Sequence, residues 1–194
     1  MWHGMDEEDI MKVNTALAKY RVFTADFLDA LPEGAWVEMI DGQLFLMASP
    51  TRMHQRLQLF LGYEIETYIR KHAGDCEVYL PQYDVRLDKD NKTIVFPDLM
   101  VVCEKDKLSE KECLGAPEFV VEIVSPSSKK RDYEIKFKKY QAAGVREYWI
   151  LDWKRNQIQV NRFDQDIVEY YTFEDKVKVG IFEDLEIDFS TFKR

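Results

Sequence analysis

Short apolar runs along the chain predict a protein rich in β-strands. Residues 36–40 and 44–47 flank Asp41-Gly42, a pair typical of the two-residue turn of a β-hairpin. Further strands are predicted from apolar runs bounded by polar or turn-forming residues, at 77–80, 83–87, 93–96, 99–103, 118–124 and 148–152. The tail, 157–189, alternates between apolar and polar residues and predicts more hairpins. Residues 104–116 are predicted to form a charged loop.

Helical spacing of apolar residues separates these strands. The segments with this spacing or with helix-start signals are 6–20, 24–30, 52–73 and 129–143. Thr24 stands at the N-cap position of a brief helix, and Gly74 and Gly144 end the two longer helices. We expect the first segment to be an N-terminal helical extension, residues 1–20, of a single domain formed by residues 21–194.

The order of elements predicts an α/β fold, or α+β by some schemes. A strand, a helix and a second strand follow one another over residues 118–152, which is typical of a crossover between parallel strands. Hairpins elsewhere add antiparallel pairs. We therefore expect a central mixed β-sheet flanked by helices, with additional β-hairpins.

Composition and charge narrow the class of protein. The chain has 194 residues, of which 46% are hydrophobic and 32% charged, so it is globular and forms one domain. Its 27 basic and 36 acidic residues give a net charge of -9, which excludes a uniformly basic coat for nucleic acid. No apolar run approaches the roughly 18 residues that a membrane span needs, and we expect no membrane partner.

The cysteines and the N-terminus predict a cytoplasmic protein. The three cysteines, Cys76, Cys103 and Cys113, are odd in number and none has CxxC spacing, which favours reduced thiols over a disulfide or a zinc site. The acidic N-terminus has no apolar segment typical of a signal peptide.

Carboxylates inside apolar strands are the first candidates for chemistry. Glu122 lies in a strand apolar enough to be buried on both faces, so we expect it to have a metal, a lysine or N–H donors as its partner. Asp98 follows Pro97, which lacks a ladder donor and aims the aspartate away from regular pairing. The alternatives are an exposed strand end for Glu122 and a turn-capping aspartate at position 98.

Two further charged residues join this set. Glu38 lies in the apolar strand 36–40, although simple alternation also places it in solvent. Lys136 falls on the helical stripe of Tyr133, Phe137 and Tyr140, at the edge of the face packed on the sheet. Its ammonium is within reach of the strand ends, unless it extends into water as surface lysines do.

Two carboxylates and a lysine suit phosphodiester hydrolysis. Mg²⁺ prefers hard oxygen ligands, commonly one or two carboxylates, with waters and phosphate oxygens completing its shell. The metal lowers the pKa of a bound water and neutralises phosphoryl charge. A nearby lysine holds that water and stabilises developing negative charge.

At these residues the sequence resembles the PD-(D/E)xK nuclease superfamily, and more closely the Uma-two family of restriction-endonuclease-like proteins, which is widespread in bacteria. The resemblance spans about residues 21–163. The stretches that carry it are 23–28, Glu38 to Leu44, Ser49-Pro50 with His54, Pro97-Asp98-Leu99, Gly115 to Ser127, and Lys136 to Asp152. One position departs from the superfamily pattern, because the residue two after Glu122 is Val124 and not lysine. In the Uma-two family the lysine stands on the following helix, where Lys136 matches it.

The resemblance implies a role for each site residue. It implies Asp98, Glu122 and Ile123 at the metal, which is Mg²⁺ with Mn²⁺ as a substitute. It implies that Lys136 positions the attacking water and that Glu38 is an accessory acid. His54 also matches a recurrent family position near the start of the long helix, where it would contact substrate or a metal-bound water, although a lone histidine is more often a packing or surface residue.

DNA binding needs positive charge, and one segment supplies it. Residues 129–139 hold six basic and two acidic residues on the helix that carries Lys136. We expect Lys129 and Lys130 to contact DNA, together with Ser125 and Ser127 ahead of the helix N-terminus. A solvated helix face is the alternative. The acidic remainder predicts weak, salt-sensitive binding.

Three functions stay open at this point. The first is a Mg²⁺-dependent endonuclease that hydrolyses DNA, which is also the function that the resemblance implies, with a homodimer suited to double-strand cleavage. The second is a catalytically inactive nuclease-like fold that binds proteins or dimerises. The third is an unrelated two-carboxylate enzyme such as a glycosidase. The first two differ in whether Lys136 points into the carboxylate cluster or out to solvent.

Overall fold

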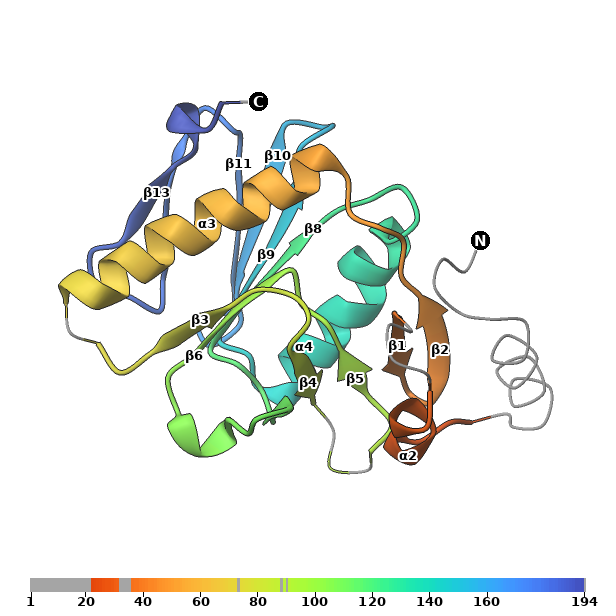
Figure 1. The fold of residues 1–194 in the computed structure, drawn as a ribbon. Coiled ribbons are helices and arrows are strands. Elements are labelled where there is room, and N and C mark those ends of the chain that lie inside the picture. The colour runs from red at the N-terminus through yellow and green to blue at the C-terminus, as the bar shows by residue number, and fades with distance from the viewer. Residues whose placement is uncertain (1–21, 32–35, 73, 88, 90, 194) are drawn as a thin grey trace.

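A computed structural model describes residues 22–31, 36–72, 74–87, 89 and 91–193 (Figure 1). The helix predicted over residues 6–20 lies outside these residues. None of the described helices is both long and apolar enough to span a bilayer.

A six-stranded mixed sheet forms the centre of the fold, with strand order β11-β10-β9-β8-β6-β3. Its strands are β3 (Glu77–Tyr79), β6 (Leu99–Val102), β8 (Phe119–Ile123), β9 (Glu147–Asp152), β10 (Gln157–Arg162) and β11 (Ile167–Tyr171). Strands β8 and β9 are parallel and all the other neighbours are antiparallel. The crossover predicted over residues 118–152 is therefore confirmed.

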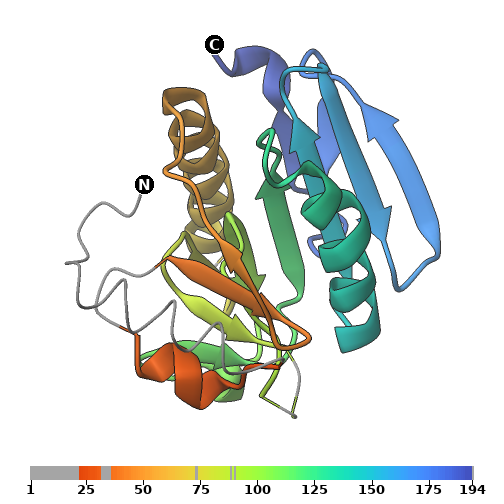
Figure 2. The same ribbon diagram turned by 90° about the vertical axis from the view of Figure 1, so that its right-hand side faces the viewer.

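Two helical elements cover opposite faces of this sheet (Figure 2). Helix α3 (Arg52–Lys71) packs Leu57, Leu61 and Ile65 against residues of β6, β8 and β9 that point to its side. The π-helix η2 (Arg131–Lys136) continues into α4 (Phe137–Ala143), whose Tyr140 packs on the other face. Successive strand residues point to opposite faces, so both faces of a strand such as β8 are buried.

A second sheet has the order β2-β1-β5-β4-β7. Its strands are β1 (Val37–Ile40), β2 (Gln43–Leu46), β4 (Asp84–Arg86), β5 (Ile94–Val95) and β7 (Glu112–Leu114). Helix α2 (Ala25–Asp29), the 3-10 helices η1 (Lys105–Lys107) and η3 (Phe189–Thr191), and the hairpin of β12 (Lys176–Lys178) and β13 (Glu186–Asp188) complete the fold. The mixed α/β class and the hairpin at Asp41-Gly42, both of whose φ angles are positive, are confirmed.

One local prediction is wrong and another needs a refinement. The segment 104–116 is not only loop, because it contains η1 and strand β7, which pairs in parallel with β4 and is held there by the ion pair of Arg86 with Glu112 at 2.9 Å. The helix predicted over 129–143 is confirmed, and its middle part, η2, is a π-helix. π-Helical turns are rare and often accompany functional sites.

The expectation of reduced thiols is also wrong for two cysteines. Cys76 and Cys103 form a disulfide. The reason is the antiparallel register of β3 and β6, in which Glu77 is opposite Val102 and the next residues out are the two cysteines. Cys113 is free and buried, and burial raises the pKa of its thiol to about 11. The cytoplasmic location stays a prediction, now without support from these two thiols.

Candidate active site

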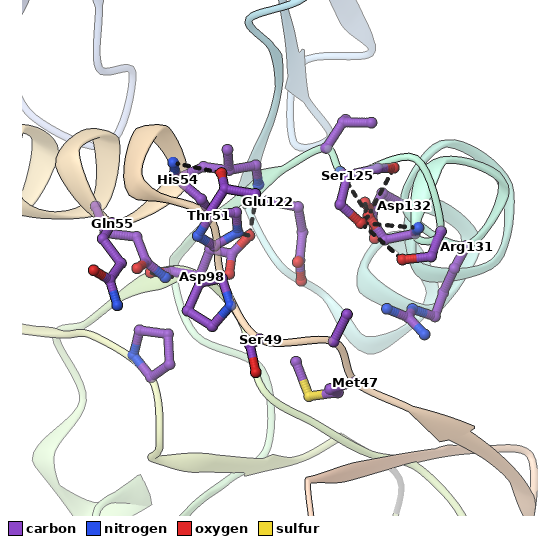
Figure 3. Close-up of a pocket in the computed structure, with 18 of the residues that line it drawn as sticks. Met47, Ser49, Thr51, His54, Gln55, Asp98, Glu122, Ser125, Arg131 and Asp132 are labelled. Atoms are coloured by element: carbon purple, nitrogen blue, oxygen red, sulfur yellow. Dashed lines mark hydrogen bonds and ion pairs between the residues drawn. The ribbon is translucent and has the colours of Figure 1, made fainter. Parts of the chain in front are cut away.

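A pocket of about 380 Å³ opens where the two sheets and the two helical elements meet. Figure 3 shows His54 and Gln55 of α3 on one side of it and Arg131 and Asp132 of η2 on the other, with Met47 below. The lining includes predicted and unpredicted site residues: His54, Gln58, Asp98, Glu122, Ile123, Ser125, Ser127, Arg131, Asp132 and Lys136.

Asp98 lies where the chain changes from β5 to β6. Pro97 separates the two strands, as predicted, and β6 begins only at Leu99. The Asp98 Oδ2 atom accepts a hydrogen bond from Ile123 N at 2.7 Å and lies 3.0 Å from His54 Nε2. Its Oδ1 atom accepts from Gln58 Nε2 at 3.2 Å. The Asp98 carboxylate thus accepts the N–H bond of Ile123 that a neighbouring strand would otherwise accept, and it lines the pocket.

Glu122 is buried in β8, as predicted, and is 3% exposed. Its Oε1 atom accepts hydrogen bonds from Lys136 Nζ at 2.8 Å and from the Tyr140 hydroxyl at 2.7 Å. Its Oε2 atom accepts none from the described residues. Burial raises the pKa of Glu122, Lys136 opposes this shift, and the Asp98 charge adds to it. One oxygen is therefore fixed and the other is available to a ligand.

Lys136 points into the carboxylate cluster and not into solvent. It is 1% exposed, and its Nζ lies 2.8 Å from Glu122 Oε1 and 2.5 Å from Glu38 Oε1. Burial lowers the pKa of Lys136, but the charges of Glu122 and Glu38 raise it more, so the net direction is upward. The amine therefore stays protonated at neutral pH and acts as a donor.

Glu38 is buried behind Lys136 and does not line the pocket. Its Oε1 atom accepts a hydrogen bond from Phe96 N at 3.1 Å, and its Oε2 atom forms an ion pair with Arg131 Nε at 3.1 Å. Through its ion pairs, Glu38 holds the side chains of Lys136 and Arg131 in place. The structure brings it to the site as a support for those cations, out of reach of the pocket.

The predicted substrate-binding residues fall into two groups. His54, Ser125 and Ser127 line the pocket, whereas Lys129 and Lys130 do not. The pKa of His54 is raised, because the hydrogen bond and charge of Asp98 outweigh its burial, which lowers the pKa. The Ser125 and Ser127 hydroxyls lie 3.1 Å apart in the turn before η2.

Lys129 and Lys130 lie outside this pocket, at the two positions directly before η2. Lys129 Nζ is 3.1 Å from Asp152 Oδ2, at the end of β9. Lys130 is exposed. Direct contact with a ligand in the pocket therefore falls to Arg131 and Lys136 among the cations of η2.

Comparison with known proteins agrees with this arrangement. The sequence model of one family, Uma2, described as "Putative restriction endonuclease", matches residues 24–190. The chain belongs to the Uma2 family. Uma2 is the family called Uma-two in the sequence analysis, so the predicted resemblance is confirmed.

One solved structure and one curated relative resemble this Uma2 protein. The structure is a putative nuclease belonging to DUF820 from Anabaena variabilis, with a TM-score of 0.72 and 20% identity, covering 88% of this chain and 97% of that one. This likeness shows the fold. The relative is the uncharacterized protein slr1290 of Synechocystis, 27% identical over 105 residues. That match spans about half the length of either protein, 53% of each.

Sequence reasoning missed three residues of the Uma2 pocket. Asp132 is 1% exposed, and its Oδ2 atom accepts from Ser128 Oγ at 2.5 Å, while its Oδ1 atom has no hydrogen-bond partner among the described residues. Burial raises its pKa to about 6, although Lys136 opposes the shift. Gln58 and Arg131 were also missed. A signal existed for two of the three, because Gln58 is four residues after His54 and Asp132 is four before Lys136, spacing that shares a helix face.

The donor set of the pocket fits a hard cation. Asp132 Oδ1 has no hydrogen-bond partner in the described part of the chain, and both hydrogen bonds of Glu122 fall on Oε1, so that Oε2 accepts none there. Asp98 Oδ1 accepts one bond, from Gln58, and so keeps a free lone pair, and Ile123 offers only its backbone. Among the described residues no three His, Cys, Asp or Glu side chains converge as a complete cage. A partial set is what Mg²⁺ commonly uses, since waters and phosphate oxygens complete its shell.

Proposed function

We propose that this protein is a Mg²⁺-dependent endonuclease that hydrolyses phosphodiester bonds of DNA. The observation that carries the proposal is the position of Lys136, whose ammonium is buried against Glu122 at the edge of a pocket that also contains Asp98. Taking this charge out of water costs several kcal/mol, which the ion pairs with Glu122 and Glu38 have to offset, and a binding module with no chemistry has no need of such an arrangement. Family and fold are those of nuclease-like proteins.

Asp98 and Glu122 would hold the metal in this proposal, with Ile123 contributing its backbone. When bound, the metal supplies a water of lowered pKa and neutralises charge on the phosphoryl group. Asp98 is held for this role by His54 and Gln58, and Glu122 by Lys136 and Tyr140. Side chains held by such contacts keep their geometry as ligands.

Lys136 would orient the attacking water and stabilise negative charge as it develops on the phosphoryl oxygens. Because its pKa is raised, it donates hydrogen bonds and is not the base. Glu38 acts through Lys136 as a positioning residue. Arg131 and the hydroxyls of Ser125 and Ser127 face the same pocket and suit contacts to phosphate oxygens.

The acidic chain limits how DNA would be held. With a net charge of -9, affinity depends on the local cations of the pocket and falls steeply with salt. Lys130 and Lys138 are exposed on the same helical element and suit outlying phosphates. The homodimer stays a prediction.

A cleavage assay with matched variants tests the proposal. We expect the wild-type protein to cut plasmid and single-stranded circular DNA with Mg²⁺ or Mn²⁺ and to stop with a chelator. Asp98→Asn should lose cleavage while its circular dichroism spectrum is unchanged. Asp106→Asn, at an exposed aspartate of η1, is the control and should cut normally. Equal cleavage by Asp98→Asn would refute the assignment, and no metal-dependent cleavage by wild type would favour the binding module.

A further inference from the structure

A second chamber of about 320 Å³ adjoins the candidate active site. Both pockets are lined by Trp36, Met47, Pro81 and Gln82, which form the boundary between them. The second chamber lies on one face of the five-stranded sheet, where Val37 of β1 and residues of β4, β5 and β7 point the same way. No residue assigned to the proposed reaction lines it.

The strand register explains the composition of this chamber. Ile94 of β5 is opposite Arg86 of β4, and Asp84 of β4 is opposite Glu112 of β7. The shared face therefore presents apolar side chains towards β1 and β5 and charged side chains towards β4 and β7. Leu28 of α2 adds apolar surface.

The charges in the chamber are balanced. Arg86 donates to both carboxylate oxygens of Glu112, at 2.9 Å each, and a third bond reaches Asn91 Oδ1 at 3.1 Å. A guanidinium that donates to both oxygens of one carboxylate has its charge paired, so Arg86 is not free to bind a second anion. Asp84 and Lys111 add one charge of each sign. The chamber is thus a poor phosphate site and suits a neutral group with apolar faces and a polar edge.

Two aromatic side chains line the second chamber, and one of them, Trp36, also lines the pocket of the candidate active site. Trp36 is 36% exposed although it is the largest type of apolar side chain, and Phe96 lies only two residues before Asp98. Two residues of extended chain span at most about 7 Å, so the chamber begins close to the proposed metal ligand. Gln82, an amide with both donor and acceptor atoms, is exposed at the same boundary.

We propose that this chamber binds an unpaired nucleobase of the strand whose phosphodiester occupies the catalytic pocket. A base has the required flat apolar faces and polar edge, and aromatic stacking of bases is sequence-tolerant. The inference rests on the proposed nuclease function and narrows its substrate to single strands or to duplexes with an extruded base. Extruding a base from a duplex costs a few kcal/mol, so single strands, mismatches and frayed ends bind better.

The test measures binding without cleavage, in the full chain carrying Asp98→Asn. The probe is a fluorescein-labelled 12-nucleotide single strand, followed by anisotropy, compared with its duplex and with copies that carry one abasic site at each position. Adding Trp36→Ala should weaken single-strand binding roughly tenfold, and Trp36→Phe should restore most of it. Tyr170→Ala, at an exposed aromatic residue of β11, is the matched control and should bind normally.

The abasic series identifies the ligand of the chamber. One abasic position should weaken binding to the parent protein and should have no further effect in Trp36→Ala. Equal affinity of Trp36→Ala, equal affinity for every abasic strand, tighter binding of the duplex or no binding of the single strand would each overturn the inference. The proposed function fails separately, if Asp98→Asn retains cleavage or if wild type never cleaves.

Discussion

Glu122 and Glu147 lie on neighbouring parallel strands and are both buried, yet their surroundings differ. Glu147, on β9, is 1% exposed, and both of its oxygens are paired. Its Oε1 atom accepts from Trp149 Nε1 at 2.7 Å and its Oε2 atom from Ile181 N at 3.1 Å, with Arg162 Nε 3.7 Å away. Glu122 concentrates two donors on one oxygen and leaves the other without any from the described chain.

The direction of the pKa shift does not separate the two residues. Burial raises the pKa of both carboxyl groups, and nearby donors or cations oppose it in each case. Hydrogen-bond satisfaction does separate them, because Glu147 has no capacity left to offer a ligand and Glu122 has. For these two glutamates, the oxygen left without a hydrogen bond distinguishes the candidate ligand from the structural residue, and the pKa shift does not.

Replacing Glu122 and Glu147 by glutamine should have opposite consequences, a loss of activity for the first and a loss of stability for the second. The loss of activity is the largest expected effect. Glu122→Gln removes a proposed metal ligand charge and should lower cleavage by at least about 10³-fold, or about 4 kcal/mol. Its stability should change by less than about 1 kcal/mol, because Lys136 keeps Glu38 as a charge partner at 2.5 Å and the new amide nitrogen can take the place of Oε2, which meets no donor of the described chain. Plasmid cleavage rates and urea unfolding measure the two quantities. A variant that cleaves normally would contradict the comparison.

Glu147→Gln should instead lower stability and leave the cleavage rate of the folded protein unchanged. The amide leaves Arg162 without its buried charge partner and turns an N–H group towards a donor. The loss should be about 2–3 kcal/mol. Urea unfolding of the variant measures it, with the assay run at a temperature where the variant is folded. An unchanged midpoint would show that the Glu147 contacts contribute little.

Local signals in the sequence predict most of the fold. Asp41-Gly42, Thr51 before the long helix and Gly144 after α4 all stand where the structure has a turn or a helix boundary. Strand β7 could not be predicted this way, because its three residues gain their place from pairing with β4 and from the Arg86–Glu112 ion pair. The disulfide depends likewise on the register of β3 and β6, which brings together two cysteines 27 residues apart in sequence.

The catalytic residues predicted from the sequence are charged residues that stand inside apolar strands or on an apolar helical stripe. Asp98, Glu122 and Lys136 stand out in that way and are brought together at the pocket. Glu147 precedes the predicted strand 148–152 and was not singled out, and it has a structural role. Asp132 lies in a charged helical segment and not in an apolar run, so only its spacing to Lys136 pointed to it. Only the wide π-helical turn and the packing on the sheet bury Asp132 beside the others.

Asp132 offers a smaller test of the same comparison, because it too is buried with one oxygen unfilled. Its folded-state pKa of about 6 exceeds the ordinary value of 3.8. The folded protein therefore binds the proton more tightly, and stability should fall as the pH rises from about 4 to 6. Asp132→Asn should remove this slope and raise stability at pH 7 by about 1–2 kcal/mol. Thermal unfolding across this pH range, with chelator present, measures it, and a variant with the wild-type slope would refute it.

The smallest expected effect concerns His54, whose raised pKa depends on Asp98. The charged imidazole and the carboxylate stabilise the folded state below the ordinary histidine pKa of 6.5, and this contribution is lost as the pH rises through the higher folded-state pKa. We expect it to be worth less than about 1 kcal/mol, as for other partly exposed pairs. In Asp98→Asn the Asp98 charge is gone, and burial, which lowers the pKa of His54, is opposed only by the Gln58 hydrogen bond, the Asp132 charge and the new amide, so this pKa should fall. NMR titration of its ring protons measures the change, with His72 at the far end of α3 as an internal reference. An unchanged His54 pKa in Asp98→Asn would mean that Asp98 does not hold the imidazole. The Asp98 carboxylate would then be held without His54, as the Glu147 carboxylate is held by its own contacts.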